Sequence, residues 1–270
     1  MKLKFILILI CILAMLFGTT GPIFAITVSS DLCQEKVSEP GVGYSEVIKI
    51  FNKEENPVEI KLYQTDYKYF SDGTNQFSEP GTESRSNAVW IKQLPQQATI
   101  APKETLLVNY TVEIPDNGQL AGSYWSMIMV EQVNQEELEL LSSAQRQMGI
   151  HQMTRYGIQV VTHIGDTGSR QIEFKNLKLV KGNDKRFLQI DMANSGTRAL
   201  RTSLWVDFYG ENNGFTKKVN GTQRRIFPDC GVMQELDLTE IPVGNYKAVV
   251  VADAGEETVF GTSFSIKINE

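Results

Sequence analysis

Short runs of alternating apolar and polar residues recur from residue 44 onward, and turn-forming residues separate them. A period of two places successive side chains on opposite faces, which is typical of β-strands with one buried face. We expect the strands of a first domain at six such runs: Tyr44–Asn52, Val58–Phe70, Ala88–Ile91, Thr105–Ile114, Gly122–Val133 and Arg155–Ile164. The polar segment 53–57 predicts a hairpin between the first two runs. The pattern therefore predicts an all-β chain.

A second series of alternating runs fills the rest of the chain, at Ile172–Val180, Phe187–Asn194, Leu200–Tyr209, Arg224–Phe227, Met233–Leu238, Tyr246–Ala252 and Thr258–Ile268. Seven short strands in about 100 residues is the size of one immunoglobulin-like sandwich. The two series echo each other, because Asn52 and Asn194 each end an alternating strand. Tyr124 and Tyr246 each lie two residues after a glycine, where a tyrosine corner is expected. We predict two tandem immunoglobulin-like β-sandwiches, residues 26–168 and 169–270.

The N-terminus has the order of a secretory signal peptide. Lys2 and Lys4 precede the apolar run Phe5–Phe17, and we expect residues 1–25 to be removed by cleavage after Ala25. An uncleaved anchor is the alternative, although the apolar run is shorter than the roughly 20 residues that span a membrane. The formal net charge is -6, and it becomes -8 without the two lysines of the signal. This acidity argues against a nucleic-acid partner. We expect an exported protein of the periplasm or cell surface, with no stable membrane span after cleavage.

Two cysteines remain after cleavage, Cys33 and Cys230. A disulfide between them is allowed in an oxidising compartment, and two buried thiols are the alternative. Asp31 lies close before Cys33 and argues against a lipidated N-terminal cysteine.

Catalytic and metal-binding patterns are missing from the sequence. The two histidines, His151 and His163, have no cysteine or acidic residue at the spacing of metal ligands. No serine stands in a nucleophile-elbow motif. We therefore expect no enzyme, no metal site and no cofactor.

The most distinctive insertion is segment 134–153, between the last two expected strands of the first domain. Leu138, Leu141, Ala144 and Met148 have helical spacing, which predicts a short amphipathic helix. Such a helix would cap the sandwich, or the insertion would be a mobile loop that guards a binding edge.

Several motifs of the first domain belong together: Ser71-Asp72-Gly73, Pro80-Gly81-Thr82, Arg85-Ser86-Asn87-Ala88-Val89-Trp90-Ile91, Ile100-Ala101-Pro102-Lys103-Glu104 and Gly122-Ser123-Tyr124-Trp125-Ser126. This stretch resembles exported bacterial proteins related to the periplasmic pilus chaperones (PapD-like). The resemblance spans most of residues 42–165, and a looser sandwich resemblance continues beyond. It implies a chaperone-like protein that binds another exported polypeptide and assists the assembly of a pilus or another surface structure.

The resemblance also implies a mode of binding. Pilus chaperones add their last first-domain strand to an incomplete pilin-like subunit, offering a backbone edge and alternate apolar side chains. The corresponding residues are Arg155, Tyr156, Ile158 and Val160, although the same alternation is typical of a strand that faces its own core. The basic pair with which the family clamps a carboxylate is not carried over, because residues 26–30 contain no arginine and the last strand contains no lysine.

A second resemblance suggests a different class of function. The order of elements is similar to that of WxL-interacting surface proteins, which bind peptidoglycan with one sandwich. The alternative function is therefore a cell-wall or glycan-binding module that uses exposed aromatic residues: Trp90, Tyr124, Trp125 and Trp205. The other role of such residues is to fill the core between two sheets.

Overall fold

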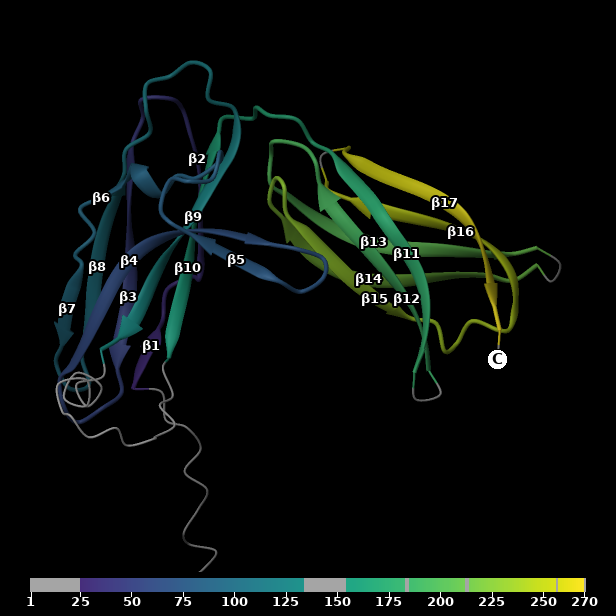
Figure 1. Cartoon of the computed structure of the whole chain (residues 1–270), viewed down its shortest axis with the longest axis horizontal. Coiled ribbons are helices and arrows are strands. Elements are labelled where there is room, and N and C mark those ends of the chain that lie inside the picture. Colours follow the sequence, from purple (N-terminus) through teal and green to yellow (C-terminus); the bar gives the residue numbers. More distant parts are fainter. Residues whose placement is uncertain (1–24, 134–153, 183–184, 212–213, 256, 270) are drawn as a thin grey trace, which may run out of the picture.

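The computed structural model describes residues 25–133, 154–182, 185–211, 214–255 and 257–269, which form two β-sandwiches joined end to end (Figure 1). Apart from one short 3₁₀ turn, the regular structure of this part of the chain is all β. The predicted fold class is confirmed. Residues 1–24 and 134–153 lie outside the described residues, and so do the predicted signal peptide and insertion helix.

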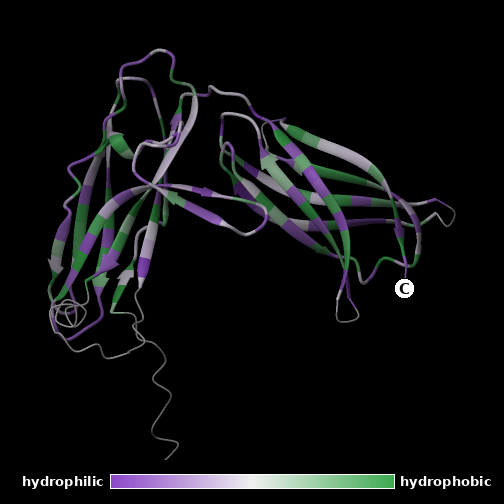
Figure 2. Cartoon of the chain, viewed as in Figure 1, coloured by the Kyte–Doolittle hydropathy of each residue, from purple (hydrophilic) through white to green (hydrophobic). Residues whose placement is uncertain are grey.

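The first sandwich packs two sheets face to face. One sheet has the order β1-β3-β8-β6, from Ile26–Val28, Tyr44–Asn52, Thr105–Val112 and Ile91–Lys92. The other has the order β2-β10-β9-β4-β5, from Cys33–Ser38, Arg155–Ile164, Gly122–Gln132, Val58–Tyr69 and Asn75–Ser78, and β7 (Gln97–Ile100) also pairs with β4. Alternate residues of each long strand face the shared core, among them Ile48, Leu62, Ile128 and Val160. Figure 2 shows this alternation as green and purple bands along the strands.

The second sandwich is built in the same way. Its sheets have the orders β11-β12-β15, from Ile172–Gly182, Lys185–Asn194 and Gly231–Asp237, and β14-β13-β16-β17, from Thr216–Ile226, Leu200–Gly210, Gly244–Asp253 and Val259–Ile268. Its core contains Leu188, Val206, Phe208 and Tyr246.

Two buried asparagines hold equivalent corners of the two sandwiches. Asn52 ends β3 and donates from Nδ2 to the carbonyls of Asn56 and Ile100, at 2.8 and 3.0 Å. Asn194 ends β12 and donates to the carbonyls of Arg198 and Ile226, both at 2.8 Å. In both cases the side-chain oxygen accepts a backbone N–H two residues further on. The echo between the two halves of the sequence is therefore a structural repeat.

The tyrosine corner exists in one sandwich. The hydroxyl of Tyr246 donates to the carbonyl of Pro242 at 2.8 Å, four residues upstream. Tyr124 instead packs against Trp90, with ring centroids 4.8 Å apart, and lies under the guanidinium of Arg85.

Three predictions about individual strands are wrong. β3 and β4 do not form a hairpin, because the chain crosses between the sheets after Asn52 so that both apolar faces meet in one core. Residues 88–90 form a 3₁₀ turn (η1, Ala88–Trp90) rather than a strand. Asn87 fixes this turn, since its buried side chain donates to the carbonyl of Val160 and the hydroxyl of Thr162. β14 begins eight residues before the predicted Arg224.

Candidate functional site

The predicted binding residues lie on β10, but two of them face inward. Ile158 and Val160 are fully buried in the first core, on the same face as Ile128 of β9. Tyr156 is partly buried and donates from its hydroxyl to the carbonyl of Ile26 at 3.0 Å. This burial conflicts with the expectation that these alternate side chains contact a partner. Their alternation instead reflects a strand that packs against the core of its own domain.

The backbone of β10 has one covered edge and one half-covered edge. β9 pairs with β10 along its whole length, from Arg155 to Ile164. On the other side, β2 pairs in parallel only with residues 159–164. Within the described residues no strand pairs with this second edge at 156–158. Gln159 directs its N–H toward Leu32 on the β2 side, at 2.8 Å. Because residues two apart point the same way, Gly157 directs its N–H and C=O toward the open edge.

The sheet face beside this open edge carries two methionines and a tyrosine near Gly157. The register places Tyr63, Met129 and Gly157 side by side on three neighbouring strands. A Cβ on Gly157 would lie 3.0 Å from the sulfur of Met127 and 3.4 Å from that of Met129. The two thioethers therefore fill the space above the glycine, and methionine side chains adapt readily to different partners. Arg155 lies at the end of this face, 2.9 Å from Glu131.

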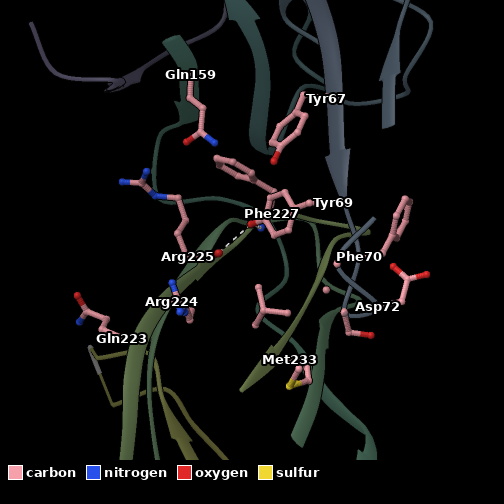
Figure 3. Close-up of a pocket in the computed structure, with 14 residues that line it drawn as sticks. Tyr67, Tyr69, Phe70, Asp72, Gln159, Gln223, Arg224, Arg225, Phe227 and Met233 are labelled. Carbon is pink, nitrogen blue, oxygen red and sulfur yellow. Dashed lines mark hydrogen bonds between the residues drawn. The ribbon is translucent and has the colours of Figure 1, made fainter. Parts of the chain in front are cut away.

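A pocket of about 540 Å³ lies between the two sandwiches (Figure 3). The β4–β5 hairpin forms one wall, Gln159 of β10 forms the top, and residues of β14 and β15 form the other wall. Tyr69 fixes the wall to the second domain, because its hydroxyl donates to the carbonyl of Arg225 at 2.7 Å and accepts the N–H of Phe227 at 3.2 Å. Phe227 also stacks on Trp125 of β9, with ring centroids 4.9 Å apart. The two domains are thus joined by an aromatic contact beside the pocket.

A buried hydrogen-bonded chain connects the domains next to this contact. The Ser123 hydroxyl oxygen accepts the N–H of Ala199 from the second domain at 2.8 Å, and it lies 2.7 Å from Nδ1 of His163. Nε2 of His163 lies 2.7 Å from Glu35 of β2. Serine, histidine and carboxylate are the groups of a hydrolase triad, but Ser123 is fully buried and its oxygen already accepts a backbone bond. This serine cannot reach a substrate, so the chain of bonds joins domains.

The carboxylate of Glu35 completes the connection. It accepts from Arg225 at 2.6 Å and from Arg201 at 3.3 Å, and both arginines belong to the second domain. Its hydrogen bond with His163, together with the nearby Arg225 charge, lowers its pKa from 4.5 to about 2 despite partial burial. Sequence reasoning missed this cluster, because its members come from five separate strands. The two arginines that bind Glu35, Arg201 and Arg225, belong to β13 and β14 of the second domain. The family's basic pair would instead lie on the first and last strands of the first domain.

Both cysteines carry free thiols, so the structure has no Cys33–Cys230 bridge. Cys230 is buried in the second core, and burial raises its pKa to about 11. Cys33 lies on β2 beside the Arg225 guanidinium, and burial raises its pKa as well. The two thiols therefore lie in separate environments and are not bonded to each other.

The aromatic residues do not form a sugar-binding platform. Trp90 and Trp125 are buried, at 7% and 3% exposure. Trp205 lies in the other domain, where its N–H donates to Asp207 and Lys218 lies over its ring. The structure thus gives no support to the glycan-binding alternative.

Over the described ranges no three His, Cys, Asp or Glu side chains are grouped closely enough to hold a metal ion. No helix in this part of the chain is long and apolar enough to cross a membrane.

The sequence matches no protein-family model and no curated protein. Among solved structures, it is similar to the class 5 fimbriae chaperone CfaA, with 13% identity over 91% of this chain and 100% of that one, at a TM-score of 0.45. A chain of a chaperone–tip adhesin complex of CFA/I fimbriae biogenesis matches at 11% identity, 88% and 97% coverage and a TM-score of 0.48. A chain of the CsuC–CsuE chaperone–tip subunit complex of Acinetobacter baumannii archaic chaperone-usher pili matches at 12% identity, 90% and 98% coverage and a TM-score of 0.46. Chaperones of fimbriae, the proteins that the sequence resembles, are therefore also among its structural neighbours.

Proposed function

We propose that this chain is an exported, non-enzymatic, chaperone-like protein that binds another exported polypeptide, a pilin-like subunit of a surface structure. Binding occurs in the periplasm or at the cell surface, by pairing of a partner strand with the open edge of β10. The observation that supports this proposal is the outer backbone edge at Gly157, which no strand covers among the described residues although β2 covers residues 159–164 of the same strand. Main-chain hydrogen bonds along such an edge supply affinity, and neighbouring surface supplies selectivity.

The surroundings of the edge favour a polypeptide ligand. Met127 and Tyr63 are half-buried near Gly157 and offer an adaptable apolar surface, whereas Met129 is buried. The interdomain pocket begins two residues further along β10, at Gln159. Charge adds a preference, because residues 26–168 contain 10 Lys and Arg against 19 Asp and Glu, a net charge of -9. A basic partner surface would be attracted to this domain and would associate faster at low salt.

Site-specific cross-linking in producing cells tests the proposal. A photo-reactive amino acid replaces Arg155 in one variant and Thr216 of the second domain in a matched control. We expect the first variant to yield a covalent adduct with an exported polypeptide and the control to yield none. Adduct formation with glycan alone, or equal polypeptide adducts from both positions, would contradict strand-edge binding at β10.

The backbone itself is tested by Gly157→Pro, which removes the N–H that points to the open edge. We expect this change to abolish the adduct formed from position 155. Gly182→Pro, at the end of β11, is the control and should leave the adduct unchanged. Replacement of Ile158 or Val160 by a charged residue is no test, because it would disrupt the core. Circular dichroism confirms that each proline variant remains folded.

A further inference from the structure

The last strands of the two sandwiches differ in how their edges are covered. In the first sandwich, β2 crosses to the second sheet and covers six residues of β10. In the second sandwich the first strand, β11, stays with β12 from Ile172 to Gly182. In the described chain β17 pairs only with β16, so its other edge is open over all ten residues (Figure 1).

The open edge of β17 lacks the features with which proteins usually protect an edge. Such edges are kept short or carry charged side chains, since unpaired backbone groups recruit other strands. Among the described strands, the other edges follow this rule: β1, β5, β6 and β7 are short, and β2 and β15 carry charges. The two long edges β11 and β14 have four charged residues each: Glu173, Lys175, Lys178 and Lys181, and Lys217, Lys218, Arg224 and Arg225. β17 has neither charge nor proline between Val259 and Ile266.

The side chains along this edge are only partly covered. Phe260, Phe264 and Ile266 pack against the second core yet remain partly exposed, because no neighbouring strand lies beyond them among the described residues. Val259 is 57% exposed. An added strand would bury these side chains and satisfy the unpaired backbone groups at the same time.

We propose that β17 is a homodimer interface, at which a second copy of this chain pairs its own β17 in the antiparallel direction. A two-fold axis at Thr262 places Phe260 of each copy opposite Phe264 of the other, a pairing that is favourable for aromatic side chains. The two β14-β13-β16-β17 sheets then form one continuous sheet, and the interface is the same patch on both copies.

Charge favours this orientation over others. Residues 169–270 contain 14 Lys and Arg against 13 Asp and Glu, a net charge of +1. The first domain, at -9, would repel another first domain. A two-fold symmetric contact at a strand edge pairs like domains, so the contact between second domains is the one with least repulsion. The β10 edge lies in the other domain, so this proposal does not depend on the proposed function.

Sedimentation equilibrium of the exported chain tests the proposal. We expect a monomer–dimer equilibrium that Thr262→Lys weakens about fivefold or more, because two like charges then face each other on the axis. Thr216→Lys adds the same charge to the opposite edge of the sheet and should leave the equilibrium unchanged. A monomer at all concentrations, or equal weakening by both lysines, would overturn the proposal.

A cysteine on the axis tests the register without adding charge. Thr262→Cys should form a covalent dimer under mild oxidation, because the two sulfurs face each other across the strands. Ser265→Cys is the control and should stay monomeric on denaturing gels, since its position faces Val259 of the other copy. The wild-type chain sets the background from Cys33 and Cys230. Equal cross-linking at positions 262 and 265 would show that the pairing is wrong.

Discussion

Glu35→Gln is expected to weaken the connection between the two domains. The carboxylate is held by His163, Arg201 and Arg225, and its pKa is lowered from 4.5 to about 2. A difference of about 2.5 units corresponds to about 3 kcal/mol at 1.36 kcal/mol per unit. The Glu35 side chain is 31% exposed, and solvent screening reduces this to about 2 kcal/mol. Glutamine keeps the shape but loses the negative charge, so we expect this loss of stability at pH 7.

The pH dependence has a definite sign. The pKa of Glu35 is lower in the folded chain, so its contribution is fully present above the ordinary value near 4.5 and is lost as the pH falls toward 2. Glu35→Gln has no such group. The difference in stability between wild type and variant should therefore be constant from pH 7 to about 5 and should shrink toward zero near pH 2.

Urea unfolding at a series of pH values measures this difference, and small-angle X-ray scattering at each pH reports whether the domains separate. Glu240→Gln is the matched control, because Glu240 pairs with Lys217 at the surface and is 79% exposed. Its effect should stay below about 0.5 kcal/mol. The reasoning fails if Glu35→Gln is as stable as wild type at pH 7, or if the difference between them persists unchanged at pH 2.

Three further substitutions test the packing. Asn194→Ala leaves the buried carbonyls of Arg198 and Ile226 unpaired and should cost about 2–4 kcal/mol in urea unfolding; equal stability would contradict the structural repeat. Tyr246→Phe removes the tyrosine-corner bond and should lower stability by about 1 kcal/mol, with no change if that bond is absent. Trp125→Ala removes the stack on Phe227 and should cost about 3–5 kcal/mol and increase the radius of gyration. An unchanged radius would show that this stack does not hold the domains together.

Sequence patterns predicted the long strands well, because burial of one face imposes a period of two on the residues themselves. β3 and β10 have the predicted bounds, Tyr44–Asn52 and Arg155–Ile164. β2 was not predicted, because its residues do not show this period of two. Among its residues Val37 is the one large aliphatic side chain, and it is 64% exposed, so no apolar alternation marks the strand. β2 is a strand because its backbone pairs with β10, a contact more than 100 residues away.

The candidate site was less predictable than the fold. Alternation at Tyr156, Ile158 and Val160 showed that these side chains share a face, but it could not show that this face is the core of their own domain. The cluster around Glu35 was equally hidden, since a single acidic residue in a polar segment has no distinctive pattern. Only the folded chain brings it to His163 and to two arginines of the other domain.

Whether a strand has a free edge is a different property from which face it buries. β10 and β17 have similar alternation, yet β2 covers part of the outer edge of β10, whereas no described strand covers the outer edge of β17. The local sequence nevertheless contains one relevant signal, the presence or absence of charge along the strand. β11 and β14 carry four charged residues each, whereas Val259–Ile266 carries none. The lack of charge along Val259–Ile266, in a domain whose other long edge strands are charged, is therefore the sequence signal that supports the proposed pairing of β17.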